Sequence, residues 1–158
     1  MKRPLLASIV ALLLTAAPAW AADGPPVPET VTFVVSTGYW EEPADAENDG
    51  AKAPAALRRG YYKLIAVRQP DGTAEVHLQQ IESTAGGPKV ASSTELEEFS
   101  ALKPYVTDIR PENSSGITAE PGLFATVYLK TDPKAEEPES WTVLIDELGE
   151  IRIERATN

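Results

Sequence analysis

The chain has 158 residues, with 14 basic and 24 acidic side chains, a formal charge of −10 and no cysteine. A chain this acidic is repelled by nucleic acid and by anionic lipid surfaces, so neither is expected as a partner. The lack of cysteine excludes disulfides, thiol redox chemistry, cysteine nucleophiles and thiolate metal sites.

Residues 1–21 have the pattern of a secretory signal peptide. The basic pair Lys2-Arg3 precedes an apolar run over residues 4–17, and Ala19-Trp-Ala21 supplies the small-residue motif that signal peptidase recognises. The apolar run is shorter than the roughly 20 residues that span a bilayer. We therefore expect export to the periplasm or the medium, and no membrane span after cleavage.

The part that follows the signal fits one domain. It has 137 residues, and because the signal removes two basic residues and no acidic one, its formal charge is −12. Residues 22–29 form a Pro-rich leader, and residues 30–158 are predicted to be a single β-rich domain.

Strand patterns dominate the first half of this domain. Residues 30–36 are rich in β-branched side chains and are bounded by Pro28 and Gly38. Residues 60–69 and 73–83 alternate in polarity around Pro70-Asp71-Gly72, which is typical of a tight hairpin loop. The first of these two strands is apolar on both sides, which places it inside the sheet. The register predicts one apolar face made of Tyr62, Leu64, Ala66, Ala74, Val76 and Leu78.

A short helix and further strands are predicted for the second half. Thr94 to Glu97 match a capping box, and Leu96 and Phe99 share one stripe of a helix that Pro104 ends. The alternation in residues 123–131 places Leu123, Ala125, Val127 and Leu129 on one face. Other strands are expected at 105–110, 140–146 and 150–155.

Together these patterns predict an α+β fold. Its main element is a mostly antiparallel sheet of five to six strands, accompanied by one short helix. The sheet either packs flat against the helix or curls into a small open barrel. Residues 40–56, 111–122 and 132–139 are expected to be loops.

One of these loops contains half of a calcium-binding pattern. Asp45, Glu47, Asp49 and Gly50 fill positions 1, 3, 5 and 6 of an EF-hand loop. Position 12 is Ala56, so the bidentate glutamate that the ion requires is missing. We interpret the segment as a solvated acidic loop rather than a metal site.

No catalytic set of residues is evident. Ser100 and Lys103 spell the S-x-x-K motif of certain serine enzymes, but the partner motifs of those enzymes are missing. His77 is the only histidine, and its neighbours suggest a half-exposed strand position. We therefore expect no catalytic residues, no metal and no cofactor.

Four aromatic residues are the main candidates for ligand contact. Tyr39, Trp40, Tyr61 and Tyr62 would form an aromatic patch for a sugar or an apolar ligand if they were brought together. The commoner position of such side chains is the core or its edge.

These observations favour a small exported, non-enzymatic binding or interaction protein of the bacterial envelope. Its acidic loops at 41–49 and 132–139, or its charged terminal hairpin, would contact an envelope protein. The alternative is a small-molecule or glycan binder whose β-barrel-like pocket is lined by Tyr and Trp side chains. A hydrolase that uses buried carboxylates or Ser100 is the third hypothesis.

Overall fold

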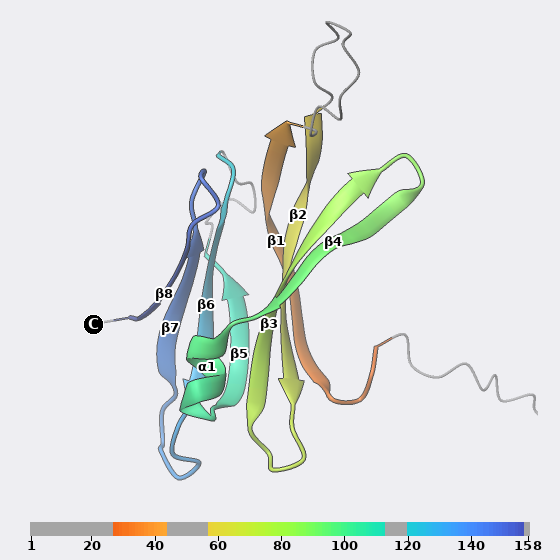
Figure 1. Cartoon of the computed structure of the whole chain (residues 1–158). Helices are drawn as coiled ribbons and strands as arrows, with labels where there is room; N and C mark the ends of the chain where they lie inside the picture. Colours follow the sequence, from red (N-terminus) through yellow and green to blue (C-terminus); the bar gives the residue numbers. More distant parts are fainter. Residues whose placement is uncertain (1–26, 44–56, 113–119, 157–158) are drawn as a thin grey trace, which may run out of the picture.

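The computed structural model describes residues 27–43, 57–112 and 120–156, which form eight strands and one helix (Figure 1). The first four strands are β1 (Val31–Pro43), β2 (Leu57–Arg68), β3 (Ala74–Thr84) and β4 (Gly87–Glu95). Helix α1 (Glu97–Leu102) joins them to the other four: β5 (Tyr105–Pro111), β6 (Leu123–Lys130), β7 (Glu139–Ile145) and β8 (Ile151–Arg155).

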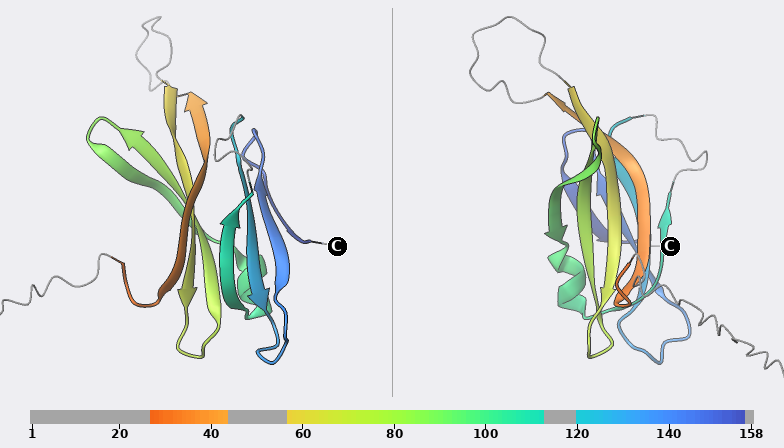
Figure 2. Two further views of the ribbon diagram at one scale, coloured as in Figure 1. Left: turned by 180° about the vertical axis from the view of Figure 1, so that it is seen from behind. Right: turned by 90° about the vertical axis from the view of Figure 1, so that its right-hand side faces the viewer.

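The strands form two antiparallel sheets that face each other (Figures 1 and 2). One sheet has the order β1-β2-β3-β4 and the other has the order β5-β6-β7-β8, so each strand pairs with its neighbours in the chain. The mostly antiparallel architecture with one short helix is confirmed. The predicted count of five to six strands is wrong, and the strands form two sheets instead of one curled sheet.

The two long sides of this sandwich differ. On one side β1 contacts β5 and β6. On the other side the outer strands are β4 and β8, and α1 covers the gap between the sheets near the β2–β3 loop (Figure 1). At the far end the β3–β4 hairpin leans away from the second sheet (Figures 1 and 2). The two sheets therefore diverge beside this hairpin.

The β2–β3 hairpin has the predicted register. Leu64 lies opposite Leu78, and the loop is closed by a 2.8 Å hydrogen bond from the Gln69 N–H to the Thr73 carbonyl. β2 lies between β1 and β3, as its two apolar faces predict. All six residues of the predicted apolar face are buried: Tyr62, Leu64, Ala66, Ala74, Val76 and Leu78.

The second sheet and the helix complete the core. The predicted face of residues 123–131 is confirmed, since Leu123, Ala125, Val127 and Leu129 are all buried. Phe99 of α1 is fully buried, and its ring meets that of Trp141 in β7 edge to face at 6.2 Å. Because α1 also contacts β3, this short helix packs against both sheets.

Three local predictions are wrong. Residues 40–43 continue β1 instead of beginning a loop, and β4 occupies residues that were assigned to no element. Thr94 does not cap the helix, because it lies in β4 opposite Leu78. The helix begins after Leu96, whose carbonyl accepts a 3.0 Å hydrogen bond from the Phe99 N–H.

Two glycines join the sheets at one point. Gly38 has a φ of +68° and lies in a bulge of β1 between Thr37 and Trp40. The bulge adds one residue to β1, so the side-chain alternation shifts and Trp40 faces the core. Beside it, Tyr39 and Gly122 form two backbone hydrogen bonds of 3.1 and 2.8 Å. This Gly38–Gly122 junction connects β1 to the start of β6.

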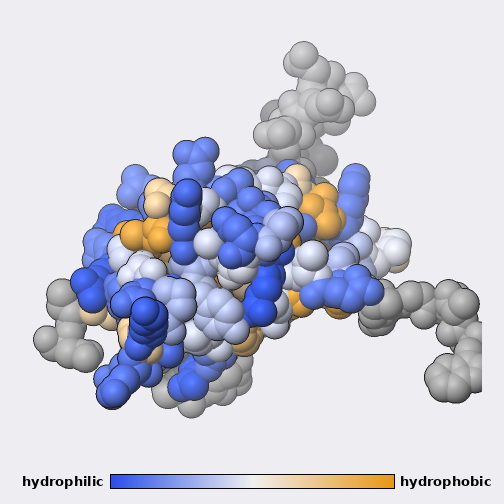
Figure 3. Space-filling model, turned by 90° about the horizontal axis from the view of Figure 1, so that it is seen from below, coloured by the Kyte–Doolittle hydropathy of each residue, from blue (hydrophilic) through white to orange (hydrophobic). Residues whose placement is uncertain are grey.

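The end of the molecule that carries the β2–β3 loop has a largely hydrophilic surface with separate apolar side chains (Figure 3). One of its aromatic residues, Tyr105, lies under the Arg68 guanidinium at 4.7 Å. Within the described ranges, no helix has the length and apolar character that crossing a bilayer requires.

Candidate functional site

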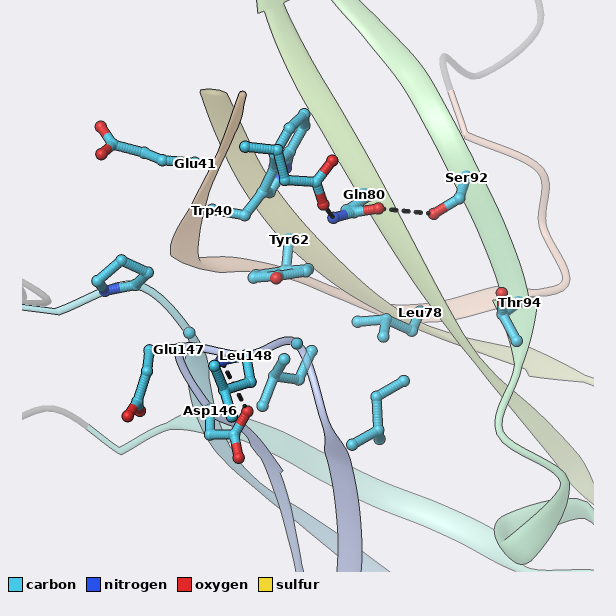
Figure 4. Close-up of a pocket in the computed structure, with 16 residues that line it drawn as sticks. Trp40, Glu41, Tyr62, Leu78, Gln80, Ser92, Thr94, Asp146, Glu147 and Leu148 are labelled. Carbon is cyan, nitrogen blue, oxygen red and sulfur yellow. Dashed lines mark hydrogen bonds between the residues drawn. The ribbon is translucent and has the colours of Figure 1, made fainter. Parts of the chain in front are cut away.

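A cleft of about 330 Å³ lies between the two sheets, beside the hairpin that leans away (Figure 4). This volume falls in the range of small-ligand pockets, which is about 300–1,000 Å³. The first sheet contributes Trp40, Tyr62, Leu78, Gln80, Ser92 and Thr94 to its walls. The second sheet contributes Ile145, Ile151 and the β7–β8 turn at residues 146–149.

The floor of the cleft is apolar and aromatic. Trp40, Tyr62, Leu78 and Ile145 are each buried to more than nine-tenths and come from four different strands. The Arg58 guanidinium lies over the Trp40 indole, with its central carbon 5.6 Å from the ring centroid. Arg58 is itself fixed by two hydrogen bonds to the Glu82 carboxylate, of 3.1 and 3.2 Å. The floor is therefore a preformed surface for an apolar group.

A polar network crosses the first sheet above this floor. The Gln80 amide nitrogen donates to Glu42 at 3.4 Å, and the Gln80 amide oxygen accepts from Ser92 at 3.2 Å. These contacts connect β1, β3 and β4 and fix polar groups at the edge of an apolar surface, which is the arrangement that orients a bound ligand.

The rim of the cleft is acidic. Glu41, Glu42, Asp146 and Glu147 line it, and none of the described lining residues is Lys, Arg or His. Asp146 has one cation nearby, since its Oδ2 lies 3.9 Å from a nitrogen of Arg152. Glu41 and Glu42 lie opposite Arg59 and Arg58 in the β1–β2 pairing, so four carboxylates face three nearby arginines and the mouth keeps a small excess of negative charge.

The β7–β8 turn forms one wall and is internally fixed. Asp146 Oδ1 accepts hydrogen bonds of 3.0 Å from the N–H groups of Leu148 and Glu150. A further 3.0 Å bond joins the Gly149 N–H to the Asp146 carbonyl. Leu148 stays 81% exposed at the tip of the turn. The turn therefore holds an exposed apolar side chain at the mouth of the cleft.

The structure separates the four aromatic candidates. Trp40 and Tyr62 line the cleft, whereas Tyr39 and Tyr61 do not. Strand alternation places Tyr61 on the face opposite Tyr62, where it lies across from Ile81. Two of the four candidates therefore lie at the cleft and two do not.

Several lining residues were missed by sequence reasoning. Gln80, Ser92 and Thr94 come from strands whose position beside a cavity depends on how the sheets meet. The one available signal was Asp146-Glu-Leu-Gly149, a turn motif that exposes a leucine between carboxylates.

The other candidates lie away from the cleft. The Ser100 hydroxyl donates to Glu95 instead of meeting Lys103, which ends α1 with a φ of +48° and is exposed. His77 is half-buried in β3, 3.2 Å from Glu75. Across the described ranges, no three His, Asp or Glu side chains are grouped in a way that could hold a metal ion. The acidic loop with Asp45, Glu47 and Asp49 lies outside the described residues.

Comparisons with protein-family models, with curated proteins and with solved structures found no match.

Burial raises the pKa of the Tyr62 phenol above its ordinary value of 10.0, and the Glu42 carboxylate acts in the same direction. The folded state therefore favours neutral Tyr62, and this contribution to stability is present below pH 10 and lost as the pH rises through the raised pKa. Between roughly pH 9 and pH 12, the native protein should lose more unfolding free energy than Tyr62→Phe. Urea denaturation across this pH range measures the unfolding free energy of the native protein and of Tyr62→Phe. Equal losses in the two proteins would show that the Tyr62 phenol does not have a raised pKa.

Proposed function

We propose that the protein is an exported, non-enzymatic binding protein of the bacterial envelope. Its site is the cleft between the sheets, and its ligand combines an apolar body with a positively charged group. The signal-like residues 1–21 support export. The absence of an identifiable catalytic set in the sequence is the reason for proposing binding without turnover.

The observation that carries this proposal is the pairing of an aromatic floor with an acidic rim. Trp40 and Tyr62 line the floor, while Glu42 and Glu147 on opposite walls are exposed. The Glu42 carboxylate lies on the cleft side of the first sheet, where it accepts a 3.4 Å hydrogen bond from Gln80. A cation between Glu42 and Glu147 would gain from both charges, and an anion would be repelled.

Calorimetric titration with three probes of similar shape tests the proposal. The probes are 4-phenylbutylamine, 4-phenylbutanol and 4-phenylbutyrate, which differ in charge but share the apolar body. We expect the amine to bind most tightly. Its affinity should fall as the salt concentration rises from roughly 0.05 to 0.5 M, because salt screens the rim carboxylates. Equal affinity for the amine and the carboxylate would refute the cationic ligand.

A charge-matched pair of variants locates the site. The double variant Glu42→Gln, Glu147→Gln should bind the amine about tenfold more weakly, which corresponds to about 1.4 kcal/mol. The control Glu136→Gln, Glu137→Gln removes the same charge from the exposed β6–β7 loop and should retain the affinity. If both double variants weaken binding equally, the effect comes from net charge and the cleft is not the site.

A further inference from the structure

The strand beside the cleft has a free edge. β4 is the last strand in its sheet, and within the described ranges its residues 87–95 make backbone hydrogen bonds to β3 and to no other strand. Alternate residues of such an edge direct their N–H and C=O groups away from the sheet. These groups can pair with one further strand, supplied by another molecule.

The four outer strands differ in how their edges are protected. β1 contacts β5 and β6, so the edges on that side meet each other. β8 carries Arg152, Glu154 and Arg155 within five residues, and charges of this kind discourage strand pairing. The β4 segment from Val90 to Thr94 is exposed and has neither a charge nor a proline. Pro88, Lys89 and a bulge at Ala91 protect the first part of β4, so the edge that remains available for pairing is Ser92–Thr94, beside the cleft.

A bulge aims this strand at the cleft. Gln80 pairs with Ser92 and Ile81 pairs with Val90, so Ala91 is an extra residue in β4. Beyond it the register is regular, and the side chains of Ser92 and Thr94 line the cleft (Figure 4). A strand added beside β4 would lie about 4.8 Å away, and every second side chain would point over the cleft mouth.

We infer that the occupant of the cleft is an extended segment of a partner protein, which pairs with β4 and directs basic and apolar side chains into the cleft. This inference rests on the proposed function, because the rim carboxylates that attract a cation attract Lys or Arg of such a segment. The apolar side chains would meet the aromatic floor and the exposed Leu148. A second copy of the chain is a poorer occupant, since it would bring together two acidic rims.

The test uses a peptide that alternates as the geometry requires. The acetylated and amidated heptapeptide Lys-Thr-Leu-Thr-Lys-Thr-Leu presents Lys and Leu on one side and Thr on the other. Two analogues carry N-methyl groups, one on every Lys and Leu and the other on every Thr. Because a strand pairs through one edge at a time, one analogue should lose at least about tenfold in affinity and the other should retain it.

Each outcome of this titration decides the inference separately from the proposed function. If 4-phenylbutylamine binds while the heptapeptide does not, or if both N-methylated analogues bind as well as the parent, strand pairing is wrong and the cleft remains a ligand site. If neither the amine nor the peptide binds, both proposals fail. Peptide affinity that is unchanged in Glu42→Gln, Glu147→Gln would also overturn the inference.

Amide hydrogen exchange gives a second readout. Bound heptapeptide should slow exchange at the outward-facing amides within Ser92–Glu95, at least about tenfold, while the amides of β8 stay unchanged. Slowing in β8 instead of β4 would overturn the inference. Exchange in β4 can also be measured without peptide at rising protein concentration, with sedimentation reporting any dimer. If exchange in β4 slows as the dimer forms, the occupant of the edge is a second copy of the chain and the inferred partner segment is wrong.

Discussion

Replacing Phe99 with alanine is expected to lower the free energy of unfolding by about 3–5 kcal/mol. The side chain is fully buried and lies between the two sheets, where its ring meets Trp141 at 6.2 Å. The six residues of α1 are too few to form a stable helix alone, so the helix depends on this packing. Urea denaturation followed by tryptophan fluorescence measures the loss.

The chain supplies a matched control for this substitution. Phe124 is the same residue type in β6, but 46% of it is exposed. Phe124→Ala should therefore cost about 1 kcal/mol or less. Similar losses for the two variants would show that α1 does not contribute to the core as described.

The second large effect is expected at the Gly38–Gly122 junction. In Gly38→Ala the new Cβ would lie 2.2 Å from the Gly122 carbonyl oxygen, and the residue would keep a φ of +68°. The left-handed conformation costs about 1–2 kcal/mol, and moving backbone out of the contact adds about 1–3 kcal/mol. We expect a total loss of roughly 2–5 kcal/mol in unfolding free energy, measured by urea denaturation.

Gly72→Ala separates the two causes. Gly72 has a φ of +86° in the β2–β3 loop, and a Cβ there would meet nothing within 4 Å. This control should lose only the conformational part, about 1–2 kcal/mol. If Gly38→Ala costs no more than Gly72→Ala, the close approach of the two sheets is not a stabilising contact.

The elements that were predicted correctly are those determined by local sequence patterns. The β2–β3 hairpin was correct in register because Pro70, Asp71 and Gly72 set the loop while the flanking residues alternate. The buried face of β6 was correct for the same reason, since Leu123 to Leu129 alternate without interruption.

The missed elements depend on pairing between distant residues. After Gly87, every residue of β4 is exposed, so hydrophobic alternation gives no signal and only the pairing with β3 makes it a strand. Thr94 fits a capping box locally, but its pairing with Leu78 prevails. The bulge at Gly38 hid the continuation of β1, because the shift in alternation looks like the end of a strand.

Only some of the residues of the candidate site could be predicted from the sequence. Trp40 and Tyr62 were two of the four aromatic candidates, but Trp40 was placed in a predicted loop and Tyr62 in a predicted strand. Their separation from Tyr39 and Tyr61 required knowledge of which face each strand turns inward. The acidic rim combines Glu41 with Glu147, which lie on different sheets, so only the packing of the sheets shows that these charges share one opening.

The pairing of every strand with its chain neighbour has a consequence for how the polypeptide acquires its structure. In the described ranges, each sheet is built from strands of one continuous half of the chain, and the isolated Tyr39–Gly122 bridge links the two halves. Contacts of low sequence separation form early, since little chain entropy is lost in closing them. The amino-terminal meander can therefore assemble before the carboxy-terminal half has been synthesised, which leaves association of the two halves as the final event.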